Sequence, residues 1–127
     1  MSWNKYKIEY PIKTSIRILY NRLSTPSGLS EWFADNVNVK NNIYTCFWGD
    51  AEEECKVLKK IENNYIRYQW IEDEGTEKYF EFLIQTDEMT QDISLIITDF
   101  AETEDEKIQE TLLWNSQIDK LKKAIGI

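Results

Sequence analysis

The side chains that could carry out chemistry in this sequence are mostly carboxylates and aromatic rings. Of the 127 residues, 23 are Asp or Glu, 15 are Lys or Arg, two are Cys and none is His. Without imidazole, a Ser–His–Asp triad, a histidine-ligated metal site and a histidine general base are excluded. Two thiols are too few for a zinc site, and no Ser, Cys or Lys nucleophile has a visible partner. We therefore predict no metal, no cofactor and no catalytic residue, with enzyme activity as a minor alternative.

Without histidine, the general base of an enzyme would have to be Asp, Glu, Tyr or Lys, and a buried acid of raised pKa would serve. Most of the acids fall in predicted turns or at the start of the last predicted helix. In the predicted strands, Glu81 faces away from Phe80 and Phe82, and Asp99 stands at a strand end. We therefore expect no acid on the apolar face of the sheet.

The aromatic side chains are the stronger candidates for a binding site. The chain has five Trp, seven Tyr and five Phe, and alternation along the predicted strands gathers several of them on one face with aliphatic neighbours. The predicted cavity lining consists of Phe47, Tyr68, Trp70, Phe82, Ile84, Leu95, Ile97, Trp114 and Ile118. We place Trp32 and Phe33 at the cavity mouth. The alternative is that the predicted lining simply fills the core, since aromatic residues carry large buried areas, and that Phe33 anchors a short helix.

The elements that must position these residues follow from the spacing of apolar residues. Residues 3–12 nearly alternate and predict a first strand, which Pro11 ends. Residues 14–34 predict two short helices, the second with Thr25 as N-cap and Pro26 at its first position. Six further strands follow with short turns between them, which predicts an antiparallel meander.

Residues 103–125 predict a long C-terminal helix. Thr103 and Glu106 form a capping box, and Gly126 can end the helix. Its predicted apolar stripe comprises Ile108, Leu112, Leu113, Trp114, Ile118, Leu121 and Ile125. A seven-stranded antiparallel sheet must bury one face, and this helix is the natural cover. The predicted fold is α+β, a helix-grip of seven antiparallel strands around the long helix with two short helices between strands 1 and 2, in one domain over residues 1–127.

The net charge and the lengths of the apolar runs limit the partners and the location that we expect for the protein. The formal net charge is −8, and an acidic surface repels phosphate backbones and anionic membranes. No apolar run has the length of a signal peptide or a membrane span. We therefore expect a cytoplasmic protein that neither binds nucleic acid nor inserts into membranes, with Cys46 and Cys55 as reduced thiols.

One segment resembles a known family. Leu19-Tyr20-Asn21-Arg22-Leu23-Ser24-Thr25-Pro26, followed by Gly28-Leu29-Ser30-Glu31-Trp32-Phe33-Ala34-Asp35, looks like the helix joint of START-like proteins. It is most similar to the family related to the C-terminal domain of activators of the heat-shock-protein-90 ATPase. The Gly-Gly hairpin that usually follows the second strand is replaced by Lys40-Asn41-Asn42-Ile43, so the chain resembles a divergent, compact branch.

The resemblance implies a helix-grip fold and a potential hydrophobic cavity, but not one activity, because the superfamily includes lipid carriers, hormone-binding proteins, polyketide cyclases and co-chaperone domains. We expect non-catalytic binding of a small hydrophobic or lipid-like molecule between sheet and helix. The main alternative is a protein-interaction or co-chaperone-like module with a filled core, including a homodimer formed through an exposed Trp3 or Trp48. A cyclase- or hydrolase-type enzyme is the third possibility.

Overall fold

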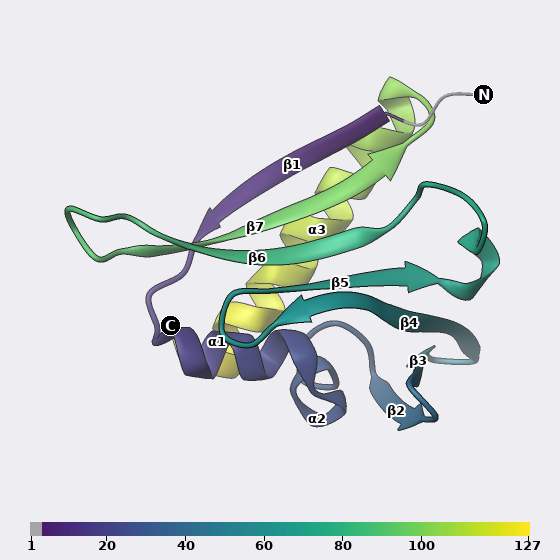
Figure 1. Ribbon diagram of the computed structural model, residues 1–127, viewed down its shortest axis with the longest axis horizontal. Helices are drawn as coiled ribbons and strands as arrows, with labels where there is room; N and C mark the ends of the chain where they lie inside the picture. The colour runs from purple at the N-terminus through teal and green to yellow at the C-terminus, as the bar shows by residue number, and fades with distance from the viewer. Residues whose placement is uncertain (1–3) are drawn as a thin grey trace.

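The computed structural model describes residues 4–127, which form one sheet and three α-helices (Figure 1). The strands are β1 (Asn4–Pro11), β2 (Asn36–Lys40), β3 (Ile43–Trp48), β4 (Ala51–Ile61), β5 (Tyr65–Trp70), β6 (Phe80–Thr86) and β7 (Ile93–Ala101). The helices are α1 (Ile16–Ser24), α2 (Pro26–Leu29), the 3-10 turn η1 (Ile71–Asp73) and α3 (Glu104–Ile125). Trp3 lies outside the described residues, so its predicted role in a strand and an interface stays a prediction.

The strands lie in the order β1-β7-β6-β5-β4-β3-β2, and every neighbouring pair is antiparallel. Strands β2 to β7 form a meander, and β1 pairs with β7 at the far edge. The long helix α3 lies across one face of the sheet, and α1 and α2 close one end of the layer between them (Figure 1). The predicted α+β helix-grip fold is therefore confirmed.

The ends of the helices follow from the capping residues. Ser15, Thr25 and Thr103 each accept a backbone N–H through the side-chain oxygen at the start of a helix, which satisfies a donor that has no partner within the helix. Pro26 occupies the first turn of α2, where its missing N–H costs nothing. Gly126 ends α3 with a φ of 93°, a left-handed conformation that favours glycine.

Gly28 permits the close approach of α2 to α1. A Cβ atom at this position would lie 2.3 Å from the backbone oxygen of Asn21 and 2.7 Å from the Cα atom of Arg22. Any other residue would push the two helices apart, so glycine is required for the sharp joint between them.

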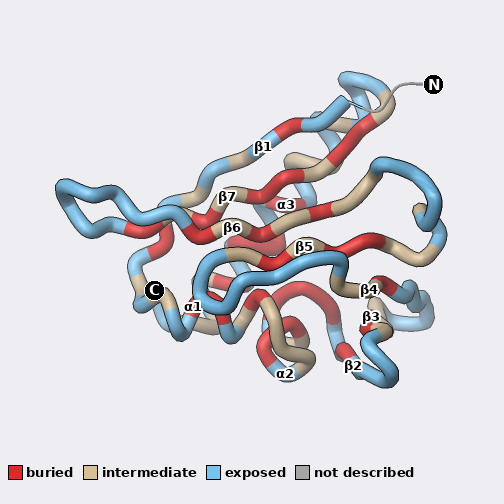
Figure 2. The backbone as a smooth tube through the Cα atoms, in the orientation of Figure 1, coloured by how far each residue is buried: buried red, intermediate tan, exposed pale blue. Residues whose placement is uncertain are grey.

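The core lies between the inner face of the sheet and α3, and it is continuous through the middle of the molecule (Figure 2). Alternate strand residues point into it, including the fully buried Tyr68, Phe82, Leu95 and Ile97. The rings of Tyr68 and Phe80 stack with centroids 5.2 Å apart. Side chains therefore fill the space between the middle of the sheet and α3, as the filled-core alternative predicted for these residues.

The predicted apolar stripe of α3 is too wide. Trp114, Ile118 and Leu121 are buried, but Ile108, Leu112 and Leu113 are 52%, 63% and 61% exposed. The sheet contacts only one narrow side of the helix, so apolar residues on its flank stay in solvent. No helix within residues 4–127 is long and apolar enough to cross a membrane.

Candidate functional site

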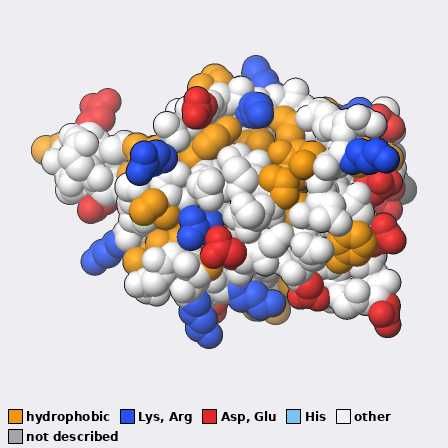
Figure 3. Space-filling view, turned by 90° about the horizontal axis from the view of Figure 1, so that it is seen from below, with side chains coloured by type: hydrophobic (Ala, Val, Ile, Leu, Met, Phe, Trp, Pro, Cys, Tyr) orange, Lys and Arg blue, Asp and Glu red, His pale blue; other side chains and the backbone are white. Residues whose placement is uncertain are grey.

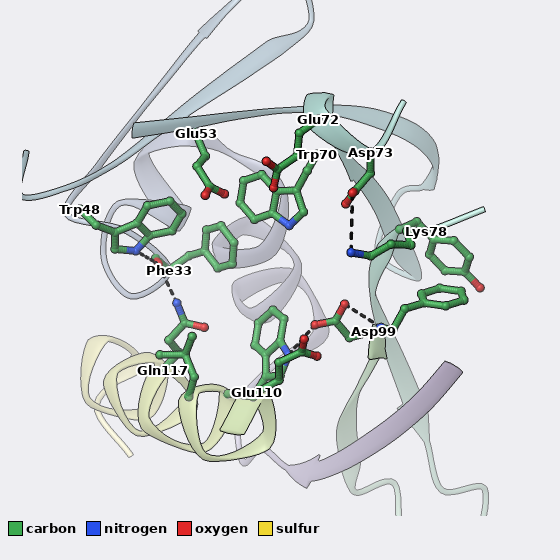
Figure 4. Close-up of a pocket in the computed structure, with 14 residues that line it drawn as sticks. Phe33, Trp48, Glu53, Trp70, Glu72, Asp73, Lys78, Asp99, Glu110 and Gln117 are labelled. Carbon is green, nitrogen blue, oxygen red and sulfur yellow. Dashed lines mark hydrogen bonds and ion pairs between the residues drawn. The ribbon is translucent and has the colours of Figure 1, made fainter. Parts of the chain in front are cut away.

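A cavity of about 430 Å³ opens between the sheet and the first half of α3 (Figure 4). Its walls come from the loop after α2, from β3, β4, β5 and β7, from η1 and the loop before β6, and from α3. The lining residues are Phe33, Trp48, Glu53, Trp70, Glu72, Asp73, Lys78, Tyr79, Asp99, Phe100, Glu110, Leu113, Trp114 and Gln117. The pocket therefore combines aromatic walls with several carboxylates.

Phe33 forms the inner end of the pocket, and two hydrogen bonds hold its backbone. The indole Nε1 of Trp48 and the amide Nε2 of Gln117 each donate to the carbonyl oxygen of Phe33, both at 3.0 Å. These bonds join β3, α3 and the loop after α2 at one point. The ring of Phe33 stacks against those of Trp70 and Trp114, each with centroids 6.2 Å apart, so the aromatic walls form one connected set.

Asp99 contributes a carboxylate to the opposite wall. Its Oδ2 accepts a hydrogen bond from the indole Nε1 of Trp114 at 3.0 Å, and its Oδ1 accepts one from the backbone N–H of Phe100 at 2.8 Å. The hydroxyl of Tyr6 donates to Oε1 of Glu110 and lies 3.5 Å from Oδ2 of Asp99. Strands β1 and β7 and helix α3 thus hold two carboxyl groups side by side at the pocket.

A second group of acids lies across the opening. Glu53 on β4 faces Glu72 and Asp73 of η1 (Figure 4). Lys78 Nζ is 3.6 Å from Oδ1 of Asp73. The side chain of Lys78 is 22% exposed and that of Asp73 is 16% exposed, so this ion pair is partly buried.

The pKa values of three pocket acids are raised. Burial raises the pKa of Asp99 to about 6, although its bonds to Phe100 and Trp114 act in the opposite direction. Burial also raises the pKa of Glu110, with the charge of Glu106 adding to it against the hydrogen bond from Tyr6. Burial, and then the neighbouring charges of Glu72 and Asp73, raise the pKa of Glu53. Burial at the pocket is therefore the main cause of all three shifts.

Comparison with known proteins places the chain in a family. The model of the START-like superfamily domain matches residues 1–127. The chain belongs to the START-like superfamily. No curated protein matches it, but several solved structures do. A Bacteroides fragilis protein determined by NMR in solution is 36% identical to it, with 100% of this chain and 94% of that one covered and a TM-score of 0.70.

Two more distant structures share the fold of this START-like chain. The Aha1 dimer from Colwellia psychrerythraea is 21% identical, with a TM-score of 0.77 and 100% of this chain and 98% of that one covered. A Mesorhizobium loti protein is 15% identical, with a TM-score of 0.77 and 96% of each chain covered. The predicted START-like resemblance is confirmed by the match of the family model to residues 1–127.

The pocket between the sheet and α3 includes three of the predicted site residues. Trp70 and Trp114, predicted in the lining, and Phe33, predicted at the mouth, all line it. The other predicted lining residues on the inner face lie deeper in the packed core rather than at the pocket, namely Tyr68, Phe82, Ile84, Leu95, Ile97 and Ile118. The cavity lies at the mouth of the helix-grip, because bulky side chains fill its centre.

Two predicted positions differ in orientation. Phe47 was predicted in the lining, but Tyr44 and Cys46 are the buried residues of β3, so alternation puts Phe47 on the outer face and Trp48 on the inner one. Trp32 was predicted at the mouth, but it is 2% exposed and its Nε1 donates to the carbonyl oxygen of Arg22 at 2.8 Å. That bond fastens the loop after α2 to α1.

The expectation that no acid lies on the apolar face is wrong. Asp99 continues the alternation of Ile93, Leu95 and Ile97, so it lies on the inner face of β7 and lines the pocket. The same spacing, carried two residues further, would have found it. Glu53 lies two residues before the buried Cys55 on β4 and is found in the same way.

No metal site is formed among residues 4–127, since no three His, Cys, Asp or Glu side chains in this part of the chain lie in a metal-binding arrangement. Cys46 and Cys55 are buried free thiols on the neighbouring strands β3 and β4.

Proposed function

We propose that this START-like domain binds a small molecule with a substantial apolar part in the pocket beside α3, without transforming it. The observation that carries this proposal is the cavity of about 430 Å³ walled by Phe33, Trp48, Trp70 and Trp114. Small-molecule sites typically measure about 300–1,000 Å³ and combine apolar walls with a few polar groups. The packed core beneath the pocket keeps these walls in place in the absence of a ligand.

The test is to identify a ligand and to locate it. Native mass spectrometry of the protein purified from its own host, followed by organic extraction, is expected to detect a co-purifying small molecule. Thermal-shift measurements with added fatty acids, sterols, flavonoids and alkyl amines extend the search. A clean apo mass together with no thermal shift from any compound would overturn the proposal.

The chain offers a matched pair of variants for locating the ligand. Trp48 lines the pocket, whereas its neighbour Phe47 lies on the outer face of the same strand. Trp48→Ala is therefore expected to weaken ligand binding about tenfold or more, by loss of an aromatic wall, and Phe47→Ala to leave it unchanged. Circular dichroism of both variants checks that the fold is retained.

A protein-interaction module is the second candidate, favoured by the exposed apolar flank of α3. Ile108, Leu112 and Leu113 are each more than half exposed there, and exposed apolar patches can mark interfaces. A homodimer through this flank would be seen by light scattering after size exclusion, and Leu112→Glu is expected to abolish it. A monomeric wild-type protein would contradict the homodimer.

A further inference from the structure

The pocket carries an excess of negative charge among its aromatic walls. Among the described lining residues, five are acidic and one is basic, namely Glu53, Glu72, Asp73, Asp99 and Glu110 against Lys78. The ammonium of Lys78 is 3.6 Å from Asp73, and its charge also acts on Asp99 and Glu110. One lysine among five carboxyl groups leaves the lining with an excess of acidic side chains. Acidic side chains also gather at the right-hand end of Figure 3, the end at which β4 begins and the loop after β5 lies in Figure 1.

The acidic side chains point into the pocket from two sides. Figure 4 shows the carboxyl groups of Glu53 and Glu72 on one side of the pocket and those of Asp99 and Glu110 on the other. The repulsion within the first group contributes to the raised pKa of Glu53. A positive charge placed between the two groups would be attracted by both, and the attraction is strengthened by the low dielectric of a partly buried site.

The aromatic walls suit the same kind of guest. Trp48, Trp70 and Trp114 surround the space between the carboxyl groups, and tryptophan is the side chain that attracts cations most strongly through its ring face. The indole N–H groups of Trp48 and Trp114 are hydrogen-bonded to Phe33 O and Asp99 Oδ2, so these rings are held in position before a ligand arrives. Pre-positioned walls reduce the entropy lost on binding.

From these observations we propose that the ligand of the pocket is an organic cation, with an ammonium group among the tryptophan rings and carboxylates and an apolar body beside it. This inference rests on the proposed binding function and specifies its ligand class. It also predicts that fatty acids bind weakly, because the acidic side chains of the lining repel their carboxylates.

Three probes that differ only in their head group test the charge preference. Decyltrimethylammonium, decanol and decanoate have the same chain and carry a positive, neutral and negative head group. Isothermal titration calorimetry below micellar concentrations is expected to give an affinity for the ammonium at least about tenfold above that for decanol, from cation–π and Coulomb attraction together. Decanoate is expected to bind more weakly than decanol.

A matched pair of double variants separates the pocket from the overall charge of the protein. Glu53→Gln with Asp99→Asn removes two carboxylates that line the pocket, whereas Glu52→Gln with Glu54→Gln removes two from the same strand β4 that do not line it. The first pair is expected to weaken decyltrimethylammonium binding by about tenfold and decanol binding by clearly less, so that the preference for the ammonium falls. The second pair is expected to change neither by more than about twofold, because alternation along β4 puts these side chains on the other face of the sheet, where salt screens their charge from the pocket.

The outcomes distinguish this inference from the proposed function. Equal affinity for the three probes, with all binding lost in Trp48→Ala, would overturn the cation preference and retain the pocket as a ligand site. Ammonium binding that both double variants weaken equally would also overturn it, because the attraction would then come from the surface. If no probe binds and no ligand co-purifies, both proposals fail.

Discussion

The indole of Trp114 on α3 donates a hydrogen bond to the carboxyl group of Asp99 on β7, with 3.0 Å between Nε1 and Oδ2. The bond joins the covering helix to the inner face of β7 near its C-terminal end. Tyr6, Glu110 and Lys78 also face this carboxyl group, from β1, α3 and the loop before β6. A carboxyl group is thus held at the boundary between the packed core and the open pocket.

The raised pKa of Asp99 makes the stability of the protein dependent on pH. Asp99 binds its proton more tightly in the folded state, with a pKa of about 6 against an ordinary value of 3.8. The folded state therefore binds more protons between these values, so this group lowers stability as pH rises from about 4 to about 6. Asp99→Asn removes this pH dependence. The free energy of unfolding of the variant minus that of wild type is therefore expected to be more positive at about pH 8 than at about pH 4.5.

Urea unfolding of Asp99→Asn and wild type at the two pH values measures this difference. Asp87 provides a control that does not titrate in this range, because backbone hydrogen bonds from Thr90 and Met89 lower its pKa below the ordinary value of 3.8. Asp87→Asn is therefore expected to lose the same amount of stability at both pH values, since Asp87 is ionised in the folded and the unfolded state at each of them. An Asp99→Asn variant that is relatively less stable at the higher pH would contradict the prediction.

The fold was predictable because each signal came from several residues that agreed. Ile66, Tyr68 and Trp70 share the inner face of β5, as their alternation predicted. The caps at Thr25 and Thr103 lie where the sequence placed them. Local patterns of this kind depend on the backbone of one segment and need no knowledge of its neighbours.

The site was less predictable because it depends on register between segments. The run from Ile43 to Trp48 is almost continuously apolar, so its sequence does not say which residues face inward. The antiparallel pairing of Tyr44 with Cys55 and of Cys46 with Glu53 decides it and puts Phe47 outside. Asp99 was treated as a strand end, although the strand continues to Ala101.

The two faces of the sheet are expected to differ sharply in their tolerance of truncation. Phe82 is fully buried on β6, with the rings of Trp32 and Trp114 at 5.6 and 5.8 Å. Phe82→Ala is expected to lower the free energy of unfolding by about 3–5 kcal/mol, and Phe47→Ala by no more than about 1 kcal/mol. Urea unfolding measures both. Equal costs would mean that the register assigned to β3 is wrong.

The two sides of α3 provide a second matched pair. Leu121 is fully buried and Leu112 is 63% exposed on the same helix. Leu121→Ala is expected to cost about 2–5 kcal/mol, whereas Leu112→Ala is expected to stay within about 0.5 kcal/mol of wild type. Thermal unfolding at several protein concentrations checks the second value. A concentration-dependent loss in Leu112→Ala would instead indicate that this flank is covered by a second copy.

Replacing Trp114 by Phe tests whether its bond to Asp99 depends on charge. The variant keeps an aromatic ring against Phe33 and Phe82 but removes the N–H that Asp99 accepts. A hydrogen bond to a charged group contributes about 1.5–3 kcal/mol, so the cost is expected to be largest above the pKa of about 6, where Asp99 is ionised. It is expected to shrink on acidification, since the pKa of Asp99 rises when a bond to its charged form is lost.

Trp32→Phe is the matched control, because the indole of Trp32 donates to the neutral carbonyl of Arg22 at 2.8 Å. Its cost is expected to be the same at both pH values, since neither partner titrates between them. Urea unfolding at about pH 8 and about pH 4.5 gives both comparisons. If Trp114→Phe also costs the same at both values, the bond to Asp99 contributes through shape rather than charge, and the electrostatic role given to this carboxyl group in the pocket is wrong.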